Sequence, residues 1–166
     1  MDFKNINDLN IYLQKIIDQS LADQVAKTVK DEIQMSVSET VYNAYDPRVY
    51  NRRGGSSNGG MGNPLGTGSL ADQEEMISEV SGGVLRVVDV AGFNENYGHE
   101  NDSIDMGKSL AYNIEYGYGD KTAPYKAPRP FIQKATEEMK ETKSHVNALA
   151  EGLSKRGVQV KGWILT

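Results

Sequence analysis

The sequence predicts an α+β fold, and three observations support this prediction. Residues 6–45 carry apolar side chains at spacings of three and four, without a glycine or proline among them. Two apolar segments within residues 76–91 flank Ser81-Gly82-Gly83, which is typical of a hairpin turn. A second helical pattern runs from Pro130 to about residue 156. The predicted order is helix, hairpin, strand, helix and strand, within one domain of 166 residues.

The first helix is expected over residues 6–45, capped by Asn5 or Asn7 and ended by Pro47. Apolar residues from Leu13 to Tyr45 recur every four positions, so their stripe drifts by ~40° per step around a straight helix. Forty helical residues would span ~60 Å, whereas a compact domain of this size is about 40 Å across. The helix therefore either breaks, near Ser20 or Ser36–Ser38, or extends past its own domain and presents apolar surface to a neighbouring subunit.

An antiparallel sheet is expected to follow. Its hairpin comprises Met76–Val80 and Val84–Ala91, and both faces of the second strand are mainly apolar. Such a strand is typical of a central position with cover on each side. Leu110–Tyr118 is predicted to be a further strand and Val158–Leu165 a short final one. The C-terminal helix, residues 130–156, is expected to pack on this sheet.

Three segments outside the predicted elements are candidates for assembly. Residues 54–68 contain seven glycines and are predicted to form a flexible loop. This loop either becomes ordered on assembly or is an ordinary flexible loop. Residues 94–109 form an acidic loop. The segment before the glycines is rich in tyrosine and arginine, the residue types that anchor interfaces, although a tyrosine cluster closing the helix is an alternative. Its candidate interface residues are Tyr42, Tyr45, Arg48, Tyr50, Arg52 and Arg53.

Composition and charge exclude several functions. The absence of cysteine excludes disulfides, thiolate nucleophiles and cysteine-based metal sites. No segment approaches the ~20 apolar residues that cross a bilayer, so no membrane partner is expected. Net charge is −5, distributed as −3 over residues 1–50, −5 over 51–110 and +3 over 111–166. This balance disfavours binding to nucleic acid. It suits head-to-tail contact between subunits, and an ordinary solvated surface is the alternative.

No motif for chemistry is complete. Gly107-Lys108-Ser109 resembles the end of a phosphate-binding loop, but the glycine required five positions earlier is Asp102. His99 and His145 are far apart and lack a second histidine at ligand spacing. The sequence therefore predicts no enzymatic activity, no cofactor and no metal, and an enzyme using Lys108 is the disfavoured alternative.

Two stretches carry a resemblance to a known family. Tyr42–Arg53 is followed by Thr67-Gly68-Ser69-Leu70, and Tyr112-Asn-Ile-Glu115-Tyr-Gly117-Tyr-Gly119 precedes Pro128-Arg129-Pro130-Phe131 and Ala135. In this order they resemble the tail-completion, or head–tail joining, proteins of tailed bacteriophages, over most of residues 40–140. The glycine-rich loop and the acidic insertion are longer than that family usually has.

The resemblance implies a structural virion protein of the phage neck, made in the host cytoplasm, that forms a homo-oligomeric ring, a hexamer by similarity. Its partners would be the tail terminator or tail tube and the head completion or connector protein, with DNA passing through an acidic lumen. Leu70, Glu115, Arg129 and Phe131 join the candidate interface, and Arg129 either pairs with Glu115 or lies on the surface. The alternatives are a tail terminator ring and a non-viral soluble protein-binding module.

Overall fold

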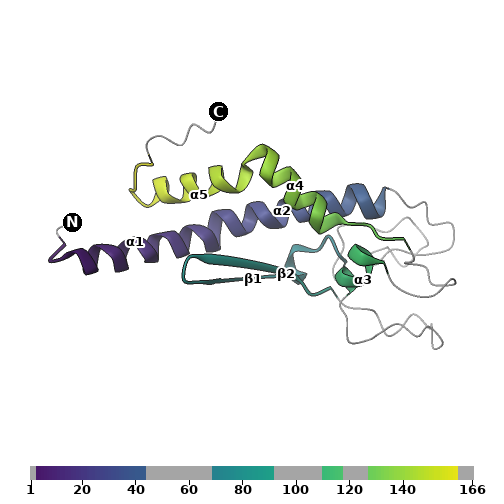
Figure 1. Cartoon of the computed structure of the whole chain (residues 1–166), viewed down its shortest axis with the longest axis horizontal. Helices are drawn as coiled ribbons and strands as arrows, with labels where there is room; N and C mark the ends of the chain where they lie inside the picture. The colour runs from purple at the N-terminus through teal and green to yellow at the C-terminus, as the bar shows by residue number, and fades with distance from the viewer. Residues whose placement is uncertain (1–2, 44–68, 92–109, 118–126, 161–166) are drawn as a thin grey trace.

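The long N-terminal helix forms the axis of an elongated molecule (Figure 1). The computed structural model describes residues 3–43, 69–91, 110–117 and 127–160. A β-hairpin lies along one side of the long helix, and the C-terminal helices lie along the other (Figure 1). The predicted glycine-rich loop 54–68, acidic loop 94–109 and the tyrosine- and arginine-rich residues 45–53 fall outside the described residues.

The long helix is continuous from Ile6 to Tyr42, so the predicted helix is confirmed and neither proposed break occurs. It comprises α1 (Ile6–Ser20), the π turn η1 (Leu21–Val25), α2 (Ala26–Val37) and the π turn η2 (Ser38–Tyr42). A π turn closes over five residues instead of four, so it rotates the helix against the drift of a four-residue apolar repeat. The first π turn directly follows Ser20 and the second begins at Ser38, where a break was considered, and both keep the apolar stripe on the core.

Hydroxyl groups mark both π turns. Ser20 Oγ donates to the carbonyl of Ile16 at 2.8 Å, and Ser38 Oγ donates to the carbonyl of Gln34 at 3.0 Å. Such bonds to the carbonyl four residues back compete with the helical ladder and bend or loosen it. At the start of the helix, Asn5 Oδ1 accepts from the amide of Asp8 at 2.9 Å, which confirms Asn5 as the cap.

The hairpin lies where it was predicted, but it is less covered than was predicted. Strands β1 (Met76–Ser81) and β2 (Val84–Asp89) pair antiparallel, with Ile77 opposite Val88 and Glu79 opposite Arg86. Gly82 and Gly83 both have positive φ, 57° and 81°, as a two-residue primed turn requires. Within the described residues β2 pairs with β1 alone, and one face of the hairpin is exposed. The prediction of a central strand covered on both faces is therefore wrong.

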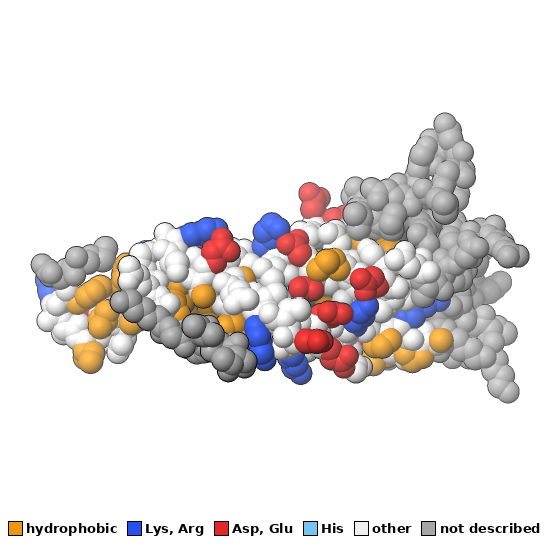
Figure 2. All heavy atoms as spheres, turned by 90° about the horizontal axis from the view of Figure 1, so that it is seen from above, with side chains coloured by type: hydrophobic (Ala, Val, Ile, Leu, Met, Phe, Trp, Pro, Cys, Tyr) orange, Lys and Arg blue, Asp and Glu red, His pale blue; other side chains and the backbone are white. Residues whose placement is uncertain are grey.

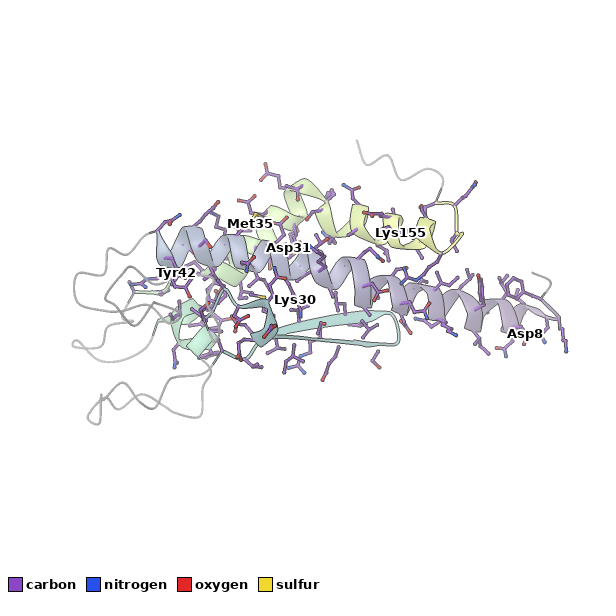
Figure 3. All side chains as sticks on the ribbon, turned by 180° about the vertical axis from the view of Figure 1, so that it is seen from behind. Asp8, Lys30, Asp31, Met35, Tyr42 and Lys155 are labelled. Carbon is purple, nitrogen blue, oxygen red and sulfur yellow. The ribbon has the colours of Figure 1, made fainter. Side chains whose placement is uncertain are left out.

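The base of the hairpin is attached to α2 by a polar seam. Gln34 Nε2 donates to the carbonyl of Ala71 at 2.6 Å, and Gln73 Nε2 donates to Asp31 Oδ1 at 2.8 Å. Gln73 opens the short 3-10 turn η3 (Gln73–Glu75), whose start is capped by Asp72. Lys30, Asp31 and Met35 mark this stretch of α2 (Figure 3). These contacts fix where the hairpin leaves the long helix.

Residues 110–116 form a helix, α3 (Leu110–Tyr116), so the predicted strand Leu110–Tyr118 is wrong. Ala111, Ile114 and Glu115 are buried, and their spacing of three and four places them on one side of a helix. Tertiary contacts at this end decide the conformation over the strand preference of tyrosine and isoleucine, which is weak over so short a segment.

The C-terminal helix is confirmed but divided. It consists of α4 (Phe131–Thr142) and α5 (Ser144–Lys155), separated by Lys143 in the left-handed conformation with φ 57°. Residues 158–160 adopt no regular structure, so the predicted final strand Val158–Leu165 does not begin there. The rest of that predicted strand, from residue 161 on, lies outside the described residues. In the described part of the chain, no helix has the length and apolarity to cross a membrane.

Two apolar clusters hold these layers together. The larger joins the second half of the long helix to Leu70, Met76, Ile114, Phe131 and Ala135. The smaller joins Leu21 and Val25 of η1 to Ala148 of α5, with Val80 and Leu85 of the hairpin packed against it. The long helix lies between the hairpin and the C-terminal helices (Figure 1). The C-terminal helices therefore contact the hairpin through the smaller cluster and do not cover the sheet, contrary to the prediction.

Candidate interaction surfaces

Apart from Glu115, the predicted interface residues divide into three groups. Tyr45, Arg48, Tyr50, Arg52 and Arg53 lie outside the described residues. Phe131 and Leu70, 0% and 2% exposed, serve the core of the subunit itself. Tyr42 is half-buried in η2, and Arg129 is half-buried just before α4.

Glu115 has a structural task within the subunit. Its two carboxylate oxygens accept hydrogen bonds from the backbone amides of Ile132 and Gln133, at 2.8 and 3.0 Å. A carboxylate is favoured there because the first amides of a helix are otherwise unpaired and carry partial positive charge. The amide of Arg129 donates to the carbonyl of Ile114 at 2.8 Å. The Pro-Arg-Pro-Phe segment is thus fastened to α3, while an Arg129–Glu115 ion pair stays a prediction.

A buried polar cluster lies where the hairpin base meets the end of the long helix. Asp89 is buried, and its Oδ1 accepts from the amide of Ala91 at 2.9 Å. Burial raises the pKa of Asp89 to about 6, with the carboxylates of Glu75 and Asp72 adding to the effect. Burial also raises the pKa of Tyr42, which hydrogen-bonds with Ser69.

Across the described segments, no three histidine, cysteine or acidic side chains are placed to hold an ion together. His145 is half-buried on α5, whereas His99 and Lys108 fall outside the described residues.

The exposed side of the hairpin is apolar, and we call it the outer hairpin face. Alternation along both strands places one set of side chains away from the long helix. Ile77 is 50% exposed and Val84 is 66% exposed, and the acid Glu79 stands opposite the base Arg86 at the centre. The outer hairpin face comprises Ile77, Glu79, Val84, Arg86, Val88 and Val90.

A second apolar surface lies at the start of the long helix. The hairpin turn contacts the helix at Asp18, whose Oδ1 accepts from the amide of Gly83 and from Gln14 Nε2, both at 2.9 Å. The helix continues past this turn and past α5, with Asp8 near its far end (Figures 1 and 3). We call residues 3–13 the helix overhang. Ile6 is 77% exposed there, and apolar side chains gather at this tip (Figure 2).

The helix overhang continues the apolar side that is buried farther along. Leu9 and Leu13 are half-buried and Ile16 is buried, on the same side of α1 as Ile6. The ring of Phe3 packs on that of Tyr12, with centroids 5.2 Å apart. The expectation that the helix extends past its own domain is therefore confirmed at its N-terminal end.

The sequence suggested that a long helix could present apolar surface to a neighbouring subunit, without showing at which end, and it did not identify the outer hairpin face as a site. The signal for the outer hairpin face was present, because apolar residues on both faces of residues 84–91 indicate that something covers each of them. That cover was assigned to the same subunit, since a sequence does not show which element supplies it.

Comparison with known proteins places the chain in a family. Residues 5–155 match the family model YomN, so the chain belongs to the YomN family. It is similar to the SPbeta prophage-derived uncharacterized protein YomN of Bacillus subtilis (strain 168), with 26% identity over 160 residues, which covers 94% of this chain and 97% of that protein. No solved structure matches the chain. The family thus has a member encoded by a prophage, which links this chain to phage genes.

Proposed function

We propose that this chain is a structural subunit of the phage neck, a tail-completion or head–tail joining protein that forms a ring between the tail and the head connector. The observation that carries the proposal is the presence of two separate exposed apolar surfaces, the outer hairpin face and the helix overhang, on a chain of a phage-linked family. Contiguous exposed apolar surface marks sites of association.

The position of the two surfaces favours a ring. They lie at different places on the subunit and have different shapes, a flat sheet and a helix tip (Figure 1). Unlike surfaces that meet head to tail generate a ring when the rotation closes. A subunit with one self-complementary surface would instead favour a two-fold dimer.

The motifs behind the family resemblance also support the proposal. The Pro-Arg-Pro-Phe segment aims Phe131 into the core, and Glu115 caps the helix that follows. Together they form a compact unit at the end of the long helix.

In this role the subunit contacts the tail terminator or tail tube on one side of the ring and the head completion or connector protein on the other. It assembles in the host cytoplasm and remains in the virion. DNA passes through the lumen, and the net charge of −5 over residues 51–110 would limit its adhesion if those residues line the passage.

The test is deletion of the gene from the phage that encodes it, with the gene supplied in trans as the control. We expect DNA-filled heads and tails of normal length that remain unjoined, and restored infectivity on complementation. Tails of irregular length would instead identify a tail terminator. Normal virions at normal yield would contradict both roles and favour a binding module, and a persistently monomeric chain in size-exclusion chromatography with light scattering would agree with that outcome.

A further inference from the structure

We propose that the helix overhang of one subunit docks on the outer hairpin face of the next, and that this contact builds the ring. The inference rests on the proposed ring function and names the partner of both surfaces, a second copy of this chain. Each surface has strongly exposed apolar side chains in the described part of its own subunit, Ile6 on the overhang and Ile77 and Val84 on the hairpin.

The two surfaces cannot meet within one subunit. The hairpin turn is fastened to Asp18, and the helix overhang extends beyond that point, away from both strands (Figure 1). The outer hairpin face is directed away from the long helix, because the opposite face packs against η1 through Val80 and Leu85. Only another molecule can therefore bring the overhang to this face.

The dimensions of the surfaces agree. From Ile6 to Leu13 the helix overhang advances by about 10 Å at the rise of an α-helix. From Ile77 to Ser81 strand β1 advances by about 14 Å at the rise of an antiparallel strand. The apolar side of the overhang thus fits within the length of the hairpin, where Ile77, Val84 and Val88 would receive Ile6 and Leu9.

The charges of the two surfaces are also complementary. The outer hairpin face carries one acid and one base, Glu79 and Arg86, and the overhang carries Lys4 and Asp8. Although Glu79 and Arg86 are cross-strand neighbours, neither these two nor Lys4 belongs to a side-chain ion pair within the described residues. Lys4, which precedes the helix cap Asn5, can pair with Glu79 of the next subunit, whereas Asp8 is two residues from Ile6 and lies on the other side of the helix. Charge pairs of this kind fix register more than they add affinity.

Two variants test the contact, each altered at exposed positions. The overhang variant is Ile6→Glu, and the hairpin variant is Ile77→Thr with Val88→Thr, which retains strand preference. Met35→Gln changes another exposed apolar residue, on α2, and serves as the control. We expect each test variant to weaken self-association by at least about 10-fold, equivalent to ~1.4 kcal/mol, while the control assembles like the wild type.

Mixing the two variants gives the decisive result. Each is defective at a different surface, so an equal mixture retains one intact junction between an overhang and a hairpin. We expect complexes with the mass of two chains, one of each kind, by light scattering and by mass spectrometry of the intact complex. If the hairpin faces instead paired with each other, the overhang variant alone would still dimerise and mixing would restore nothing.

A charge exchange fixes the register. Lys4→Glu and Glu79→Lys are each expected to weaken assembly, and the double variant is expected to recover it, because the opposite charges again face each other across the contact. A double variant that is weaker than both single variants would argue against this pairing.

Variants that assemble as well as the wild type, or a wild type that is monomeric at every concentration, would overturn the inference. The proposed function is judged separately by the deletion phenotype. If deletion leaves heads and tails unjoined while the overhang and hairpin variants form normal rings, the function stands and this contact is wrong.

Discussion

The carboxylate of Glu115 caps the N-terminus of α4 by accepting from the backbone amide of Ile132. Its Oε2 accepts from the Ile132 amide at 2.8 Å, and its Oε1 accepts from the Gln133 amide at 3.0 Å. Glu115 is only 7% exposed, so this charge is retained in the interior by a helix terminus. The contact joins α3, which ends at Tyr116, to α4, which begins 15 positions later at Phe131.

Replacement of Glu115 by alanine should destabilise the fold. It leaves two amides unpaired in a partly buried place, and hydrogen bonds to a charged group contribute about 1.5–3 kcal/mol each, so we expect a loss of at least ~2 kcal/mol in the free energy of unfolding. Urea denaturation followed by circular dichroism measures it. Glu141→Ala, at an exposed position on α4, is the control. Equal stability of the two variants would show that the cap is not needed.

Gly152 allows α5 to approach the long helix closely. A Cβ atom there would lie 2.7 Å from Gln24 Oε1 and 2.8 Å from Ser20 Cβ. Alanine favours a helix over glycine by ~1 kcal/mol, but the clash forces the helices apart. We therefore expect Gly152→Ala to be destabilising by about 1–3 kcal/mol in thermal or urea unfolding. Ser154→Ala, on the exposed side of α5, should change stability by no more than about 0.5 kcal/mol. A stabilised Gly152→Ala protein would refute the close approach.

Asp89 should make stability decrease as pH rises. Its pKa is raised to about 6 in the folded state from the ordinary value of 3.8, so the native protein holds the proton more tightly than the unfolded chain. The contribution is fully favourable below pH 3.8 and is lost as pH rises toward 6, by roughly 2–3 kcal/mol in all.

Asp89→Asn isolates this effect because the amide keeps an oxygen for the Ala91 amide and does not ionise. The stability of the variant relative to the wild type should increase between pH 4 and pH 7 in a series of urea titrations. Glu79→Gln, an exposed change on the same hairpin, should give no comparable trend. A difference between Asp89→Asn and the wild type that is independent of pH would contradict the prediction.

Lys143 joins α4 to α5 in a conformation that suits glycine. Its φ is 57°, and a side chain in the left-handed region costs about 1–2 kcal/mol. Lys143→Gly removes that cost but adds backbone entropy to the unfolded chain, so we expect a net gain of up to about 1 kcal/mol in unfolding free energy. The matched change Lys140→Gly, inside α4, should lose about 1 kcal/mol. Thermal unfolding of both variants measures the contrast, and losses of equal size would show that Lys143 is unstrained.

The sequence by itself determined where most regular elements lie. Apolar spacing located the long helix from Ile6, and the glycines after Ser81 located the hairpin. Pro130 and Gly157 bracketed the C-terminal helices. These signals are local, because helix periodicity and turn chemistry act within a few residues of the chain. The excess length of the long helix left two outcomes open, a break in the helix or an extension past the domain.

Only the tertiary structure decided three further features. Residues 110–116 became helical because Ala111, Ile114 and Glu115 are buried together and Glu115 caps α4. The two π turns kept a drifting apolar stripe on one core. The packing of η1 between hairpin and α5 left Ile77, Val84 and the helix overhang exposed. Each depends on contacts between residues far apart in sequence, which local preferences do not encode.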